Sequence, residues 1–388
     1  MSRFLFLLVL GLGLVGTLAF VLQPEGEAQV QTALSVAEAM GGDTTGYARA
    51  DVVRPFIFPA DHGPHPDFKT EWWYYTGNLT AEDGHRFGYQ VTLFRIGLAP
   101  PAVVPTSSSD WATRQLYMGH FAVSDLDERQ FYDAERFSRG AAGLAGAQAS
   151  PFRVWLEDWT IFSADPSGLP MEIEFATDEV ALDLTLTPAK PHVLQGDRGL
   201  DPKGEGVGNA SYYYSFTRLN TTGTVTVGTD TRPVSGLSWL DREWSTSALD
   251  DNQVGWDWFA LQLSNGYDLM YYQIREADGT PSRFTHGVVV DPAAESVQID
   301  GAGTVLTVTD TWTSPLTGGT YPTAWRFENV GQGVDLTITA FFPEQELDTS
   351  VRYWEGAVQI EGTMRGEPVT GRGYVEMTGY GDDPSRAS

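Results

Sequence analysis

The sequence contains no cysteine. This absence excludes disulfide bonds, thiolate metal sites, a cysteine nucleophile and a lipid-modified N-terminal cysteine. Basic residues are also scarce: 24 Lys and Arg residues stand against 51 Asp and Glu residues, and the only lysines are Lys69, Lys190 and Lys203. A net charge of −27 argues against nucleic-acid binding through phosphate contacts. Such an acidic composition is typical of proteins that work at high salt.

Sequence signatures of catalysis and cofactor binding are missing as well. There is no G-x-S-x-G or S-x-x-K motif, and Ser238 is the nearest candidate for a hydrolase nucleophile. The glycines of GLGLVG lie in an apolar N-terminal run, not after a strand, so they do not indicate a nucleotide site. His62 and His65 lie in a loop with no evident third metal ligand. We therefore expect no cofactor and no metal ion.

The N-terminus has the pattern of a targeting segment. Arg3 precedes an uncharged apolar run at 4–22, and Ala19 and Ala28 mark candidate cleavage sites. The run is also about as long as an uncleaved helix that crosses a bilayer. Residues 1–28 are therefore predicted to be a signal peptide or an inner-membrane anchor. Both alternatives export the rest of the chain to the periplasmic or extracytoplasmic side.

Beyond residue 51, β-strand patterns dominate and helical periodicity is almost absent. Three hairpins are predicted from strand-like runs that flank Asp83-Gly84, Asn265-Gly266 and Arg365-Gly366, the second with a two-residue Asn-Gly turn. The pattern predicts an all-β chain. Its predicted parts are a linker with one short helix at 29–51, an N-terminal domain at 52–233, a C-terminal domain at 234–381 and a tail at 382–388.

Four motifs carry a resemblance to a known family: EWWYYTGNL (71–79), WLDREWSTS (239–247), GWDWFALQL (255–263) and GYVEMTGY (373–380). They resemble the AttH-like / carotenoid 1,2-hydratase (hydroxyneurosporene synthase) family, also labelled "predicted secreted hydrolase". The resemblance implies two tandem lipocalin-like β-barrels that face each other. It also implies an apolar small molecule as ligand (a carotenoid, isoprenoid or lipid) and a link to the hydration of a C=C bond.

The sequence departs from the carotenoid hydratases at one motif. Those enzymes carry a His-Asp-His-like core where this chain reads Leu240-Asp241-Arg242. Asp241 matches the aspartate, and both histidines are missing. The chain therefore looks closer to the AttH-like branch, and the missing histidines favour binding over catalysis.

Asp241 is the candidate proton donor for hydration or isomerisation of a polyene or isoprenoid. A carboxylic acid in an apolar cavity keeps its proton at neutral pH because burial raises its pKa. Tyr271 or Tyr74 is the candidate hydroxyl that orients water, and Glu71 is a candidate second carboxylate. Aromatic faces stabilise a cation. The predicted ligand-binding residues are Trp72, Tyr74, Trp239, Glu243, Trp256 and Trp258.

Strand alternation bears on whether Arg242 neutralises this acid. Neighbouring residues on a strand point to opposite faces, so Trp239, Asp241 and Glu243 are predicted to share a face that Arg242 does not. The alternative is a charged network that closes a barrel end, with Arg242 paired to a carboxylate and stacked on indole.

Two further residues have two interpretations each. Glu71 is either a cavity carboxylate or the partner of an inward arginine. His120 follows an apolar strand and is either a core histidine or a cavity acid or base.

Two other functions remain open from the sequence. A lipocalin-like barrel can hold one apolar ligand without changing it. An exported or anchored protein of this kind would pass a lipid between membranes or to a transporter partner. The second alternative is a secreted hydrolase built on distant residues.

Overall fold

The computed structural model describes residues 43–103, 109, 112–246, 249–250 and 252–380. Apart from turns and loops, these ranges form β-strands and two 3-10 helices, η1 (Ala60–His62) and η2 (Val330–Gln332). The predicted targeting segment, the linker helix and the tail at 382–388 lie outside the described residues. Among the described helices, none has the length and apolar character needed to cross a membrane.

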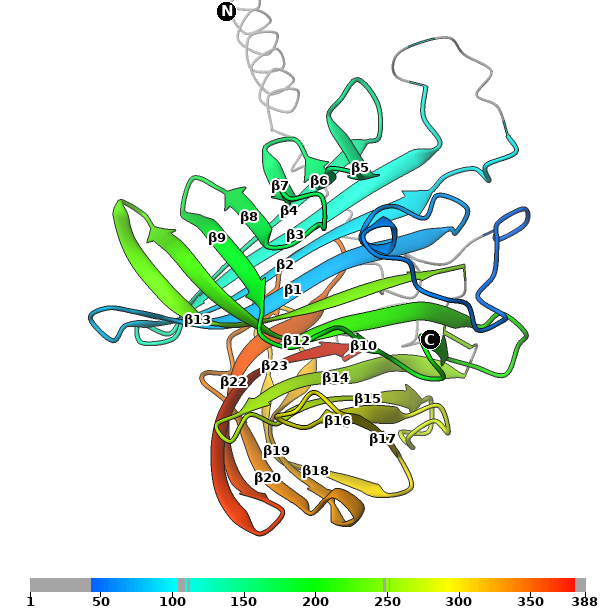
Figure 1. The fold of residues 1–388 in the computed structure, drawn as a ribbon. Helices are drawn as coiled ribbons and strands as arrows, with labels where there is room; N and C mark the ends of the chain where they lie inside the picture. Colours follow the sequence, from blue (N-terminus) through cyan, green and yellow to red (C-terminus); the bar gives the residue numbers. More distant parts are fainter. Residues whose placement is uncertain (1–42, 104–108, 110–111, 247–248, 251, 381–388) are drawn as a thin grey trace, which may run out of the picture. The chain divides into compact units, whose positions relative to one another are not determined.

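The described strands form two sheets that follow one another along the chain (Figure 1). The first sheet has the strand order β4 (Gln130–Arg139), β3 (Gln115–Asp125), β2 (Arg86–Gly97), β1 (Thr70–Ala81), β13 (Asp230–Ser245), β12 (Ala210–Val227), β9 (Val180–Pro188), β8 (Met171–Ala176), β7 (Trp159–Phe162), β6 (Phe152–Leu156) and β5 (Ala145–Ala149). Two short strands, β10 (Val193–Leu194) and β11 (Leu200–Pro202), pair with β12.

The second sheet has the strand order β17 (Ser296–Asp300), β16 (His286–Val290), β15 (Asp268–Glu276), β14 (Gln253–Leu263), β23 (Glu367–Thr378), β22 (Tyr353–Met364), β20 (Val334–Ala340), β19 (Thr320–Asn329) and β18 (Thr304–Thr313). The short strand β21 (Glu346–Leu347) pairs with β22. In the strand orders of the described residues, β4 does not pair with β5, and β17 does not pair with β18. Each predicted barrel is therefore a sheet whose ladder does not close.

The all-β prediction is confirmed, and the three predicted hairpins are β1–β2, β14–β15 and β22–β23. The predicted domain boundary after residue 233 is corrected, because it falls inside β13. Pro233 occupies the exposed outer part of the β12–β13 hairpin, where it faces Thr224. Because β13 pairs with β1 and β12 along its length, the chain changes sheet between Ser245 and Gln253.

The three larger groups of buried side chains organise the two sheets. The first sheet encloses a core with Trp73, Phe121 and Leu184, and the second sheet encloses a separate core with Trp325 and Ile338. A third group joins the sheets and includes Tyr74, Tyr213 and Trp239 from the first, with Trp258 and Tyr272 from the second. The interior of each sheet is therefore filled with side chains, and the site lies where the sheets meet.

Candidate active site between the two sheets

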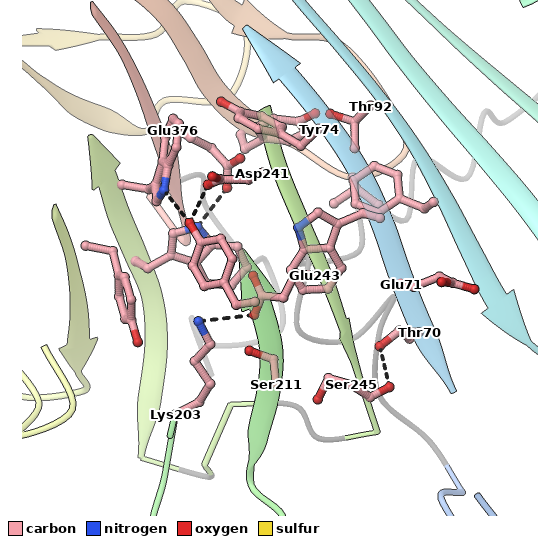
Figure 2. A pocket seen from close by; sticks show the side chains of 18 of the residues that line it. Thr70, Glu71, Tyr74, Thr92, Lys203, Ser211, Asp241, Glu243, Ser245 and Glu376 are labelled. Carbon is pink, nitrogen blue, oxygen red and sulfur yellow. Dashed lines mark hydrogen bonds and ion pairs between the residues drawn. The ribbon is translucent and has the colours of Figure 1, made fainter. Parts of the chain in front are cut away.

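A cavity lies at the contact between the two sheets. The volume of this cavity is about 140 Å³. Its walls come from β1, β2, β3, β12 and β13 on one side and from β14, β15, β22 and β23 on the other. Figure 2 shows Asp241, Tyr74 and Glu376 near one end and Lys203, Ser211 and Ser245 near the other.

Asp241 projects into this cavity from β13 and is 4% exposed. One carboxylate oxygen accepts hydrogen bonds from Ser215 Oγ at 2.5 Å and from Trp239 Nε1 at 2.7 Å. The other oxygen accepts a short hydrogen bond from the hydroxyl of Tyr213. All three donors are neutral side chains, so the carboxyl is oriented by hydrogen bonds and has no ion-pair partner among the described residues.

Burial raises the pKa of Asp241 from 3.8 to about 7. The three hydrogen bonds lower it and the charge of Glu243 raises it, but loss of hydration is the largest effect. Asp241 thus holds a proton on a substantial fraction of molecules at neutral pH. A general acid in this range is suited to proton transfer near neutrality.

Arg242, the next residue, lies on the opposite face of β13 and does not contact this acid. Its guanidinium makes a short ion pair with Glu71, donates to Gly63 O at 2.6 Å and lies 3.9 Å from the ring centre of Trp73. The prediction that strand alternation separates Asp241 from Arg242 is confirmed. The alternative of an Arg-carboxylate pair stacked on indole also exists, and it involves Glu71 instead of Asp241.

Glu71 borders the cavity but is held as an anion. It is fully buried between Arg242 and Arg95, and both arginines hydrogen-bond its carboxylate. Burial alone raises the pKa of this carboxyl, but the two cations outweigh that effect and hold it well below its usual range. The prediction of a catalytic role for Glu71 is therefore wrong, because a carboxylate with two cationic partners does not donate a proton near neutral pH.

Glu243 lines the same cavity face as Asp241 and differs from it in having a cation nearby. Lys203 Nζ lies 3.2 Å from Glu243 and 2.6 Å from Asp201. The ammonium group also lies 4.3 Å from the ring centre of Tyr272. Burial raises the pKa of Glu243 while Lys203 lowers it. This end of the cavity is an ion-paired polar wall.

The aromatic wall is close to the predicted one. Trp72, Tyr74, Trp256 and Trp258 all line the cavity. Trp239 lies behind Asp241, where its indole N–H orients the carboxyl and its ring meets Trp258 edge to face. Its predicted role in ligand contact is therefore replaced by one in positioning the acid.

Tyr271, one of the two candidates for the hydroxyl that orients water, does not line the cavity. Its side chain packs in the core of the second sheet against Phe327, and Tyr272 lines the cavity instead. A two-residue Asn-Gly turn would have put Tyr271 on the cavity face. The observed loop has three residues, since Leu263 N donates to Tyr267 O, and Gly266 has φ of 86°. This one-residue difference in register moves each side chain of β15 to the other face.

Sequence reasoning missed several cavity residues. Tyr213 and Ser215 hold Asp241 from the neighbouring strand β12, and they are visible in the sequence only as part of a strand. Glu376 lies in one of the quoted motifs, and its partner Glu355 faces it across the β22–β23 hairpin. The register of the predicted Arg365-Gly366 turn would have paired these two glutamates.

The remaining candidates have structural partners. His120 lines the cavity and contacts Tyr353 Oη at 2.7 Å and Glu135 Oε1 at 2.9 Å. His62 contacts Tyr214 Oη, and His65 stacks on an indole ring. Ser238 Oγ is outside the cavity and contacts two hydroxyl groups, so it has no base beside it. Within the described ranges, no cluster of three or more His, Asp or Glu side chains has the arrangement of a metal site.

The model of the AttH-like family matches residues 49–380. A protein assigned as AttH from Nitrosomonas europaea has a crystal structure that is 34% identical to this chain, with a TM-score of 0.75, and the match covers 86% of this chain and 99% of that one.

Two further comparisons concern kievitone hydratase. The enzyme of Fusarium solani subsp. phaseoli is 23% identical over 239 residues, and the match spans 60% of this chain and 66% of that enzyme, just under two thirds of its length. The crystal structure of the enzyme from Nectria haematococca has a TM-score of 0.64 at 17% identity and covers 87% of this chain and 96% of that one. The second likeness shows a shared fold.

Proposed function

Because the chain belongs to the AttH-like family and has a buried acid without a cationic partner in its cavity, we propose that it hydrates or isomerises a C=C bond of an apolar ligand. Asp241 is the observation that carries this proposal. It combines burial, three neutral hydrogen-bond donors and a pKa raised to about 7. These are the properties of a carboxylic acid that acts as a proton donor near neutral pH.

In the proposed reaction Asp241 gives its proton to one carbon of the double bond. A C–H bond forms, the double bond is lost and a carbocation remains on the other carbon. The faces of Trp72 and Trp258 stabilise that charge, each by about 0.5–2 kcal/mol. A water molecule then forms the C–O bond and gives one proton to a carboxylate of the cavity. Loss of a proton from an adjacent carbon to such a carboxylate gives the isomer instead.

Tyr213 connects the acid to the cavity. When Asp241 is protonated on the oxygen next to Tyr213, the tyrosine hydroxyl accepts its hydrogen bond. Trp258 Nε1 lies 3.3 Å from the same hydroxyl. Since Tyr213 lines the cavity, its own hydrogen is then directed to the ligand side. A proton can therefore reach the ligand from Asp241 directly or through Tyr213.

The substrate class that we propose is an acyclic polyene or isoprenoid, including carotenoids. The aromatic wall of the cavity suits an apolar chain, and Asp241 and Glu376 lie near the same end of it. A relative that is named as a hydratase supports the type of reaction, and it does not identify the substrate.

The test is incorporation of ¹⁸O from labelled water. Purified protein is incubated with kievitone, with lycopene and with a lipid extract of the host, and the products are analysed by mass spectrometry. The proposal expects one labelled hydroxyl group in a product of the wild type, formed at least about a hundredfold more slowly with Asp241→Asn. Absence of any hydrated or isomerised product from all three sources contradicts it.

Non-enzymatic binding is the second candidate, and the missing histidines beside Asp241 favour it. Because both sheet interiors are filled, a carried ligand would occupy the space between the sheets. A carrier would return the ligand unchanged with the wild type and with Asp241→Asn alike.

We also propose export, with residues 4–22 as a signal or an inner-membrane anchor, and a transporter as a partner that exchanges the ligand. Cell fractionation with an antibody against the folded part tests the location, and recovery in the cytoplasm contradicts it.

A further inference from the structure

Glu355 and Glu376 form a pair of carboxyl groups beside the cavity. They are directly opposite each other on β22 and β23, so their side chains share one face of the second sheet. Glu355 is fully buried, and Glu376 lines the cavity. Each carboxyl group affects the pKa of the other. Glu355 Oε2 has no hydrogen-bond partner among the described residues.

The outer oxygens of the pair are held by neutral donors from both sheets. Tyr74 Oη donates to Glu355 Oε1 at 2.6 Å, and Trp256 Nε1 donates to Glu376 Oε1 at 2.7 Å. No ion pair of the described residues involves either glutamate. By contrast, buried Glu71 has two arginines, and buried Asp268 has Lys190 and Arg218.

Two buried carboxyl groups that face each other across adjacent strands do not both ionise, because like charges so placed repel. The pair therefore keeps one proton and carries at most one negative charge. Burial and the neighbouring carboxylate raise the pKa of Glu355 well above its usual range, and burial raises that of Glu376 to about 7. Glu355 is the protonated member, and Glu376 presents the exchangeable charge to the cavity.

The pair lies at the same end of the cavity as Asp241. Tyr74, which bonds Glu355, is the cross-strand neighbour of Asp241 on β1 and β13. The charge of Asp241 raises the pKa of Glu376, so the two carboxyl groups interact electrostatically. The indole of Trp256 hydrogen-bonds Glu376, and Trp258 lines the same space. An acid, a separate carboxylate and aromatic faces therefore surround one region.

We propose that the Glu355–Glu376 pair is the anionic half of the site: it binds a cationic centre on an apolar ligand and accepts the proton that water loses. This inference rests on the proposed function for its chemical step. Glu376 is the catalytic base, and Glu355 is a positioning residue that stays protonated beside it. The ligand class is a branched hydrocarbon chain with a carbocation, or with a tertiary ammonium group of the same shape.

Asp241 loses a proton to carbon, and water forms the C–O bond with the cationic carbon. Glu376 takes a proton from that water, so one molecule of water is added in total. The site then contains a deprotonated Asp241 and a protonated Glu376, and transfer of one proton between them through cavity water restores the starting state.

The test uses binding of a stable cation and needs no turnover. Full-length protein is titrated calorimetrically at about pH 8 with N,N-dimethyldecylamine, which is protonated, and with neutral N,N-dimethyldecanamide. The expected preference of the wild type for the amine is about tenfold or more. The preference disappears at about pH 5.5, because Glu376 is then protonated while the amine keeps its charge.

Four variants separate the roles. Glu376→Gln loses the preference, whereas Glu355→Gln keeps it, since glutamine is neutral at this position, as the protonated carboxyl is. Asp241→Asn retains most of it. Glu361→Gln removes an exposed carboxylate from β22, the strand of Glu355, and behaves as the wild type. Circular dichroism and thermal unfolding establish that each variant is folded.

Three results overturn the inference: equal binding of amine and amide by the wild type, no binding of either, or equal effects of Glu355→Gln and Glu376→Gln. If Glu376→Gln does not fold, disappearance of the wild-type preference at about pH 5.5 supports the inference, and a preference that persists there overturns it. If only the proposed function fails, the amine still binds in the expected pattern, but the experiment with ¹⁸O-labelled water gives no labelled product.

Discussion

Asp241 and Arg242 are adjacent in the chain, and their side chains occupy opposite faces of β13. Asp241 reaches the cavity with three neutral hydrogen-bond donors, while Arg242 pairs with Glu71 below the sheet surface. The motif that contains both residues therefore has two roles. It places the Asp241 carboxyl in the cavity without a cationic partner, and it places the Arg242 guanidinium where it pairs with buried Glu71.

Asp241→Asn is expected to reduce hydration or isomerisation by about 10²–10⁴-fold, the range for loss of a general acid. The asparagine oxygen still accepts from Ser215 and Trp239, so the cavity keeps its shape. Rates with ¹⁸O-labelled water measure the effect. Asp183→Asn removes an exposed carboxylate of β9 and serves as the control; equal rates for the two variants would contradict the assignment.

The same substitution has a predicted effect on stability. The folded protein holds a proton on Asp241 that the unfolded chain loses, because the pKa is about 7 in one state and 3.8 in the other. The free energy of unfolding of the wild type therefore falls as pH rises between these values. The Asp241→Asn variant has no titrating group at this position, so its free energy of unfolding lacks this pH dependence.

As pH rises through this range, the free energy of unfolding of Asp241→Asn should therefore increase relative to that of the wild type. The increase should be up to about 1.4 kcal/mol per pH unit. Urea unfolding at about pH 5 and about pH 8 measures the difference. A difference that does not change with pH contradicts a raised pKa for this carboxyl.

Glu71→Gln is expected to destabilise the protein by about 3–5 kcal/mol, since it leaves Arg95 and Arg242 buried without a counter-charge. The pKa of Glu71 is lowered, so its contribution is present above the pKa of the unfolded chain and is lost as pH falls through the folded value. Urea unfolding near neutral pH is the measurement. Glu174→Gln, on the exposed side of β8, is the matched control and should change little.

Tyr272→Phe and Tyr271→Phe should differ although the residues are adjacent. Tyr272 lines the cavity, and its hydroxyl lies 3.1 Å from Asp201 Oδ2 in the network with Lys203. Its loss should weaken ligand binding several-fold, whereas Tyr271→Phe should bind as the wild type does because Tyr271 packs in the second core. Calorimetric titration with the amine decides between them, and the opposite ranking would mean that β15 has the other register.

The pH dependence of catalysis should be bell-shaped and centred near neutrality. The active state needs a proton on Asp241 and none on Glu376, and burial raises the pKa of each to about 7. Activity falls at acid pH as Glu376 gains a proton and at alkaline pH as Asp241 loses one. Because Asp241 and Glu376 interact, the two apparent pKa values of this profile describe both carboxyl groups together and cannot be assigned to single residues. A rate that rises steadily with pH contradicts an acid role for Asp241.

Local patterns predicted much of this arrangement. Period-two alternation placed Asp241 and Arg242 on opposite faces, and the turn glycines located the three hairpins. The failure at Tyr271 came from one additional loop residue, which sequence patterns specify poorly and which reverses a whole strand.

Long-range packing accounts for what the sequence did not predict. The cavity exists because two sheets meet, and the contact of Tyr74 with Glu355 joins residues far apart in the chain. Glu71 was ambiguous for the same reason, because its role depends on Arg95 and Arg242 from two other strands. Only the Glu355–Glu376 pair was within reach of local reasoning, through the register of one hairpin.

The protonation state of Asp241 tests the central claim most directly. Infrared difference spectra of the wild type minus Asp241→Asn, recorded from about pH 5 to about pH 9, follow the carboxylic C=O band of this residue. The account predicts a band that is present at acid pH and disappears with a midpoint near 7. A midpoint near the 3.8 of an ordinary aspartate would contradict it.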